Sequence, residues 1–193
     1  RYIIRCMNTG KLCLFTAEGR MHQIKVLDIP HGKFRDKGLP VDNISNYDST
    51  GEHIVALMNE ADLEGEFLLF ATKDGLVKRV AGSEFLVSKR TTAATKLQEG
   101  DEVRAVLPMN GRDFAVLQTE NGYFLKFPAE DVSEKKKGAL GIRGIRLQKK
   151  DAVESAYVFA EGTETKAVYK EKEISLNRLK TGKRDTSGVK QRA

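Results

Sequence analysis

Three copies of the pattern Thr-x-x-Gly divide the 193-residue sequence, and each lies between two apolar runs. The glycines of the pattern, Gly19, Gly75 and Gly122, are 56 and 47 residues apart. Glycine has no Cβ and accepts the positive φ that a tight turn between strands requires, so each copy is typical of a β-hairpin. The expected incoming strands span 11–15, 66–70 and 113–117, and the expected outgoing strands span 21–26, 76–80 and 123–127.

A second pattern repeats after the hairpins, an aspartate two positions before a β-branched residue. It occurs as Asp42-Asn43-Ile44, Asp101-Glu102-Val103 and Asp151-Ala152-Val153, spaced by 59 and 50 residues. We expect each copy to begin a later strand of the same unit. A basic or glycine-bearing loop with a short apolar stretch precedes the second and third copies, so each unit would contain about four strands.

These spacings predict an all-β, propeller-like fold. A period near 50 residues with about four strands per unit is typical of a propeller blade, and no stretch shows a sustained 3.6-residue apolar periodicity. We expect a single domain over residues 1–193, with four-stranded blades at about 11–65, 66–112, 113–163 and 164–193.

The two ends of the chain are expected to be incomplete units. A fourth hairpin would begin at Lys166, and its turn at residues 170–173 lacks the Thr and Gly of the others. Residues 1–5 would form the last strand of an earlier blade or a strand that closes the short fourth blade. The sequence starts at Arg1 without an initiator methionine, so we expect it to be a piece of a longer protein.

Positive charge is concentrated in two segments. Residues 1–132 carry a net charge of −2 and residues 151–165 carry −4, whereas residues 133–150 and 166–193 carry +6 each. Blocks of this kind are typical of surfaces that bind nucleic acid or another polyanion, and a solvated charged face is the alternative.

The remaining composition argues against several other classes. No apolar run approaches the ~20 residues of a membrane span, so no membrane contact is expected. Cys6 and Cys13 cannot supply a disulfide framework or a metal-ligand set, which favours a reducing, cytosolic location. His22, His31 and His53 lie in separate contexts, and no nucleophile-base or carboxylate pair stands out. We therefore expect no catalytic residue, no metal and no cofactor in this segment.

Several motifs together resemble a known family. Gly141–Leu147 reads Gly-Ile-Arg-Gly-Ile-Arg-Leu and leads into Asp151-Ala152-Val153. The segment 88–92 and the basic-apolar strands Lys78-Arg79-Val80 and Lys126-Phe127 accompany it. With the Thr-x-x-Gly hairpins, they make the whole chain similar to the C-terminal domain of the A subunit of bacterial type IIA topoisomerases, DNA gyrase and topoisomerase IV.

The resemblance implies a β-pinwheel, a propeller-like disc of four-stranded blades that bends double-stranded DNA around a basic rim, largely without regard to sequence. It implies a noncatalytic module of an ATP-hydrolysing enzyme, because the DNA-cleaving tyrosine of the family belongs to another domain. Its partners would be the rest of the A subunit, together with the ATPase B subunit, in the cytoplasm at the nucleoid.

One family motif is missing. Gyrase A subunits carry a Gln-Arg-Arg-Gly-Gly-Lys-Gly box on a first-blade loop that is needed to wrap DNA tightly. The nearest segment here, Lys135–Gly141, reads Lys-Lys-Lys-Gly-Ala-Leu-Gly and lies in a later blade. The sequence therefore fits a gyrase or a topoisomerase IV.

Gly138, Gly141 and Gly144 form a Gly-x-x-Gly-x-x-Gly pattern. No helix pattern follows it, which argues against a dinucleotide site.

The DNA-contacting residues are expected to be the lysines and arginines of the basic loops, since they can follow the phosphates of a curved duplex. The main candidates are Lys135, Lys136, Lys137, Arg143, Arg146, Lys149 and Lys150, with Lys180, Lys183, Arg184, Lys190 and Arg192 as a second patch and Lys89 and Arg90 as the corresponding loop of the second unit. Weaker candidates on strands are Lys78, Arg79 and Lys126. A propeller used as a protein-interaction platform is the alternative function, because fold alone does not distinguish the two.

Overall fold

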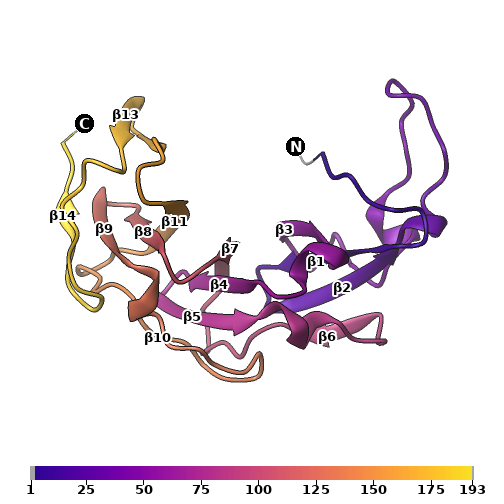
Figure 1. Cartoon of the computed structure of the whole chain (residues 1–193), viewed down its shortest axis with the longest axis horizontal. Helices are drawn as coiled ribbons and strands as arrows, with labels where there is room; N and C mark the ends of the chain where they lie inside the picture. Colours follow the sequence, from indigo (N-terminus) through magenta and orange to yellow (C-terminus); the bar gives the residue numbers. More distant parts are fainter. Residues whose placement is uncertain (1–2, 193) are drawn as a thin grey trace.

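The computed structural model describes residues 3–192, and Figure 1 shows the sheets following one another along an open arc. The first hairpin lies on one arm of the arc and the last hairpin on the other. The described residues form strands and short 3-10 helices, and no helix among them is long and apolar enough to cross a bilayer. The 3-10 helices are η1 (Val26–Asp28), η2 (Val41–Asn43), η3 (Glu60–Leu63), η4 (Gly82–Phe85) and η5 (Ala129–Asp131).

The hairpins predicted from the Thr-x-x-Gly repeat are confirmed. They are β1 (Lys11–Thr16) with β2 (Arg20–Lys25), β4 (Phe67–Thr72) with β5 (Leu76–Ala81), and β8 (Asp113–Thr119) with β9 (Tyr123–Pro128).

Both fixed residues of the repeat have a role in the turn. In the second hairpin Gly75 has a φ of +80°, and its N–H donates to the carbonyl oxygen of Thr72 at 3.0 Å. The Thr72 hydroxyl accepts a hydrogen bond from the N–H of Leu76 at 3.2 Å. The hydroxyls of Thr16 and Thr119 accept equivalent bonds, at 3.4 and 3.1 Å. The threonine therefore satisfies an amide that the turn leaves unpaired, and the glycine supplies the left-handed backbone.

A third strand pairs with each incoming strand, and its start differs from the prediction in the first unit. The strands are β3 (Ile54–Asn59), β7 (Val103–Met109) and β11 (Val153–Ala160). The second and third begin at the predicted valines, but the segment from Asp42 to Ile44 forms η2 and its C-cap instead of a strand. Because the loop before β3 is longer than its counterparts, the strand starts ten residues later.

Glu52 therefore takes the sequence position that Asp101 and Asp151 hold in the other units, and the spacing of these three residues is a regular 49 and 50. The Oδ1 atom of Asp101 accepts hydrogen bonds from the N–H groups of Asp74 and Glu102, both at 2.9 Å. The aspartate of the second pattern thus fastens the start of the third strand to the hairpin turn.

The fourth strand of each sheet comes from the following unit. β6 (Thr91–Ala93) pairs with β2, β10 (Ile142–Arg143) pairs with β5, and β14 (Val189–Lys190) pairs with β9. The described residues thus form sheets in the orders β3-β1-β2-β6, β10-β5-β4-β7 and β11-β8-β9-β14. The predicted units are contiguous in sequence, whereas each four-stranded sheet draws on two of them.

The fourth hairpin is β12 (Lys166–Tyr169) with β13 (Lys172–Ser175), in a two-stranded sheet. Its turn residues Lys170 and Glu171 adopt positive φ without a glycine. The expectation that residues 1–5 form a strand is wrong for Ile3 to Arg5, which are not in a strand, and Arg1 and Tyr2 lie outside the described residues. Ile4 packs on the apolar cluster of the first sheet instead of closing the fourth hairpin.

Apolar clusters lie between consecutive sheets. Between the first two, the rings of Phe15 and Phe70 meet with centroids 5.9 Å apart, and Phe85 from η4 contacts both at 5.2 and 5.8 Å. Val77 and Leu117 belong to the cluster that joins the second and third sheets. Each sheet therefore depends on its neighbours for burial as well as for its last strand.

Candidate nucleic-acid interface

The predicted basic loops lie along one edge of the arc. Figure 1 shows β6, β10 and β14 on the outer, convex edge, while β3, β7 and β11 lie on the inner edge. This follows from the pairing, because each of the outer strands binds the free edge of an outgoing hairpin strand. We call the segments 88–96, 133–147 and 178–192, which contain the outer strands, the basic rim.

Two segments that are far apart in sequence meet on the rim. A guanidinium nitrogen of Arg143, on β10, lies 3.4 Å from Oδ1 of Asp185. A guanidinium nitrogen of Arg146 lies 3.7 Å from the same oxygen. The Arg184 side chain donates to the carbonyl oxygens of Arg143 and, at 3.0 Å, of Asp131. The side chains of Arg143 and Arg146 remain 58% and 62% exposed, so the two blocks of positive charge form one accessible patch.

The three consecutive lysines occupy different environments. Lys136 is 86% exposed, and its Nζ lies 3.3 Å from Oε1 of Glu84. Lys137 is half-buried, and its Nζ donates to the carbonyl oxygen of Glu84 at 3.0 Å. Lys135 is also half-buried, and its backbone N–H donates to the carbonyl oxygen of Arg79. Lys136 is therefore the most accessible of the three.

Glu84, which the sequence did not single out, anchors this loop. Its Oε2 accepts a hydrogen bond from the backbone N–H of Lys137 at 2.8 Å. Burial acts to raise the pKa of Glu84, but this hydrogen bond and the Lys136 ammonium lower it below its usual value. The carboxylate thus stays ionised and fixes the loop against η4.

The strand lysines are not phosphate ligands. Lys78 is 1% exposed, and its Nζ donates to the carbonyl oxygens of Lys136, Lys137 and Ala139 at 3.3, 2.7 and 2.9 Å. Lys126 is 7% exposed, and its Nζ donates to the carbonyl oxygen of Asn177. The weak prediction that both bind DNA is wrong, because each side chain is directed inward: Lys78 holds a rim loop, and Lys126 holds Asn177, next to the last rim segment.

Lys78 should make stability depend on pH. Burial lowers its pKa from 10.5 to about 8. Between these values the unfolded chain holds a proton on Lys78 that the folded chain has released, so Lys78 makes the free energy of unfolding rise with pH, by at most about 1.4 kcal/mol per unit. Burial raises the pKa of the Cys13 thiol from 9.0 to about 12, which gives a slope of opposite sign above pH 9. Urea denaturation from about pH 7.5 to about pH 9 therefore measures the Lys78 slope. The Lys78→Met variant should lack it, and identical profiles for the two proteins would contradict the assignment.

The remaining candidates are exposed. Lys89 and Arg90 precede β6, and a guanidinium nitrogen of Arg90 lies 3.7 Å from Oδ2 of Asp28. Lys149 and Lys150 form the turn before β11, beside the turn of the third hairpin. Of the candidates in the last segment, Lys180, Lys183, Lys190 and Arg192 are exposed.

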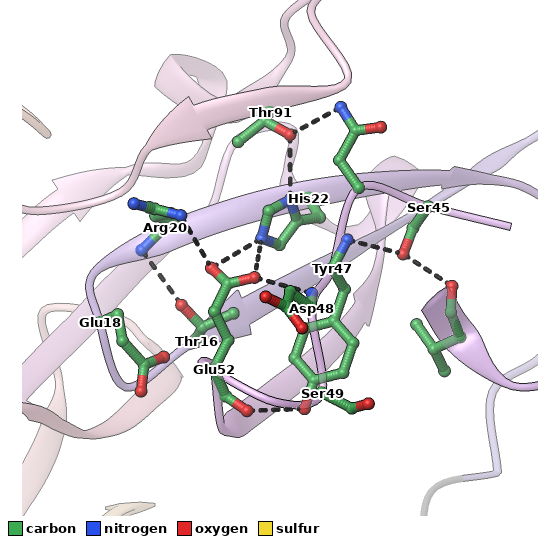
Figure 2. Close-up of polar contacts among 12 residues, drawn as sticks. Thr16, Glu18, Arg20, His22, Ser45, Tyr47, Asp48, Ser49, Glu52 and Thr91 are labelled. Atoms are coloured by element: carbon green, nitrogen blue, oxygen red, sulfur yellow. Dashed lines mark hydrogen bonds and ion pairs between the residues drawn. The ribbon is translucent and has the colours of Figure 1, made fainter. Parts of the chain in front are cut away.

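The first rim strand is supported by a buried polar cluster, shown in Figure 2. His22 on β2 is 1% exposed; its Nε2 lies 2.9 Å from Oε2 of Glu52 and its Nδ1 lies 2.9 Å from Oγ1 of Thr91 on β6. Glu52 also accepts from the N–H of Asp48 and lies 3.6 Å from the Arg20 guanidinium. The cluster ties the long loop of the first unit to β6.

Among residues 3–192, no group of three or more His, Cys, Asp or Glu side chains could hold a metal ion.

Four-stranded sheets that exchange their last strand along an arc define a propeller-like β-pinwheel. A family model described as "DNA gyrase C-terminal domain, beta-propeller" matches residues 66–110 and 113–160. The chain is similar to this family over its second and third units.

Individual relatives agree with the family match. The DNA gyrase A subunit of Lawsonia intracellularis is 35% identical over 183 residues, which cover 94% of this chain and 22% of that protein. The crystal structure of the C-terminal domain of a DNA topoisomerase IV has a TM-score of 0.86 at 26% identity, covering 94% of this chain and 58% of that one. The E. coli ParC C-terminal domain, with a TM-score of 0.77 at 21% identity over 98% and 79% of the two chains, shares the fold. The chain spans less than a quarter of the curated relatives it matches.

Proposed function

We propose that the chain is a noncatalytic module that binds and bends DNA and presents a DNA segment for strand passage by a bacterial ATP-dependent type II topoisomerase. Its partners are double-stranded DNA and the other parts of the enzyme, namely the rest of the A subunit with the ATPase B subunit. It binds DNA without a cofactor, in the cytoplasm at the nucleoid.

The observation that carries this proposal is the placement of all three rim segments on one convex edge. Phosphates repeat along both strands of a duplex, so lysines and arginines distributed along a curved edge can follow them and release condensed counterions. Bending ~20–30 bp costs about 1–6 kcal/mol, which several phosphate contacts on a rigid edge can offset. The exposed candidates on the rim provide such contacts, with affinity for the backbone and not for base sequence.

The test is binding of the chain to a duplex of about 30 bp across a salt series, with ligase circularisation of a duplex of about 150 bp, near the persistence length. We expect the logarithm of the affinity to fall linearly with the logarithm of salt concentration, by about 0.9 per phosphate contact. Circularisation should increase in the presence of the protein. An affinity for duplex that does not depend on salt, or no binding at low salt, would refute the proposal and favour a protein-interaction platform.

A further inference from the structure

The inference concerns Asp185, an acidic residue on the basic rim. In sequence, the rim segment 178–192 contains one acidic residue, Asp185, and six basic ones, which are Arg178, Lys180, Lys183, Arg184, Lys190 and Arg192. A carboxylate at this place repels the phosphates of a duplex that lies on the rim, because like charges destabilise each other. Its contacts with the neighbouring segment indicate what it does there.

The Asp185 carboxylate faces two arginines of another rim segment. Its Oδ1 lies 3.4 Å from a guanidinium nitrogen of Arg143 and 3.7 Å from one of Arg146. Charge-assisted hydrogen bonds of guanidinium groups are usually about 2.7–2.9 Å long, so both contacts are loose. Guanidinium groups bind phosphate and carboxylate with the same donors, so a phosphate can replace the carboxylate at both arginines.

The backbone around Asp185 is held without this carboxylate. The N–H of Asp185 donates to the carbonyl oxygen of Gly144 at 2.8 Å, and the N–H of Arg146 donates to the carbonyl oxygen of Thr186 at 2.9 Å. Both bonds join backbone groups, so a variant that lacks the carboxylate should keep them. The charge of Asp185 can therefore be removed while the two rim segments stay in contact.

We propose that the Asp185 carboxylate competes with DNA phosphates for Arg143 and Arg146, and that it is displaced when the rim binds a duplex. The inference rests on the proposed function, because it assigns an inhibitory contact to the same surface. Asp185 lowers the affinity of the rim, since binding breaks two ion pairs and leaves a carboxylate beside phosphates. The contact thus makes binding more easily reversed, which suits a module that presents a DNA segment and then releases it.

The experiment compares the unaltered chain with the Asp185→Asn variant, by fluorescence anisotropy with a labelled duplex of about 30 bp. Asparagine has the size of aspartate and also tolerates the φ of +62° at this position. We expect the affinity to rise about threefold to tenfold at about 0.1 M salt, because an exposed ion pair contributes roughly a few-fold and two are removed. An unchanged or lower affinity would overturn the inference.

A second comparison distinguishes competition for the arginines from general repulsion. In a chain that carries Arg143→Ala and Arg146→Ala, the Asp185→Asn substitution should change the affinity by less than about twofold, because no guanidinium is left to release. An increase as large as in the unaltered background would show that Asp185 acts on DNA by its charge alone, and would overturn the inference.

Glu134→Gln is the matched control, because Glu134 is another exposed acidic residue of the rim. Glu134 bridges to Arg79 on β5, three residues from Leu76, the partner of Arg143, so Glu134 and Arg143 are about 10 Å apart. Substitutions at this separation are usually additive, so Glu134→Gln should have the same effect in both backgrounds. A dependence on the two arginines as strong as that of Asp185→Asn would contradict the assignment.

The Asp185→Gly variant keeps the test decisive if Asp185→Asn does not fold. Glycine accepts the positive φ and lacks the carboxylate, so the same rise in affinity is expected. If neither the unaltered chain nor its Asp185 variants bind the duplex, the proposed function fails and the inference fails with it. If the unaltered chain binds and the variants bind equally well, the inference alone is overturned and the proposed function stands.

Discussion

Replacing Lys136, Arg143 and Arg146 together by alanine is expected to weaken binding to duplexes of any sequence by about 10²-fold or more at 0.1 M salt. At this concentration counterion release contributes roughly eightfold per phosphate contact, and all three side chains are accessible on the rim. The salt slope should fall by about 0.9 for each contact. Fluorescence anisotropy with a labelled duplex measures both quantities. Lys137 is left intact because its Nζ holds the loop to Glu84.

The matched control changes the same amount of charge elsewhere. Lys33, Arg35 and Lys37 are exposed and lie in the loop between η1 and η2, which projects from the first arm of the arc (Figure 1). Their replacement by alanine should change affinity by less than about threefold, below the weight of a single lost contact. An equal loss in both triple variants would show that net charge, and not the basic rim, determines binding.

The Phe85→Ala variant is expected to lower the free energy of unfolding by about 3–5 kcal/mol. Phe85 is fully buried between Phe15 of the first sheet and Phe70 of the second, so its removal leaves a cavity where the two sheets meet. Urea denaturation followed by circular dichroism measures the change.

Val168→Ala is the control for Phe85→Ala, because Val168 is 62% exposed and its truncation should change stability by less than about 0.5 kcal/mol. A loss below about 1 kcal/mol for Phe85→Ala would mean that the sheets do not depend on this contact.

Local features of the sequence predicted the hairpins correctly. The Thr-x-x-Gly repeat acts within five residues, since Thr72 and Gly75 close their own turn, and such contacts can be inferred from spacing alone. The aspartate pattern also predicted the start of the third strand correctly in the second and third units. In the first unit a longer loop precedes this strand and Glu52 stands in place of the aspartate, so the pattern placed the strand wrongly, after Asp42.

Contacts between distant residues could not be predicted in the same way. Lys78 is 58 to 61 residues from the carbonyls that it binds, and Arg143 is 42 residues from Asp185. A lysine on an outgoing strand looks identical in sequence whether it faces solvent or a loop of the next unit. The composition of the rim was therefore predictable, whereas the buried residues that shape it required the structure.

Under the proposed function, in which the chain bends DNA, the strand exchange has a mechanical consequence. Each of β6, β10 and β14 is hydrogen-bonded to one sheet and covalently continuous with the next unit. A force applied to a rim loop by a stiff duplex therefore loads two neighbouring sheets at once, and no single hairpin has to resist it alone. The elastic force of the bent duplex is therefore distributed over several sheets, so the arc can keep the duplex curved without being closed into a ring.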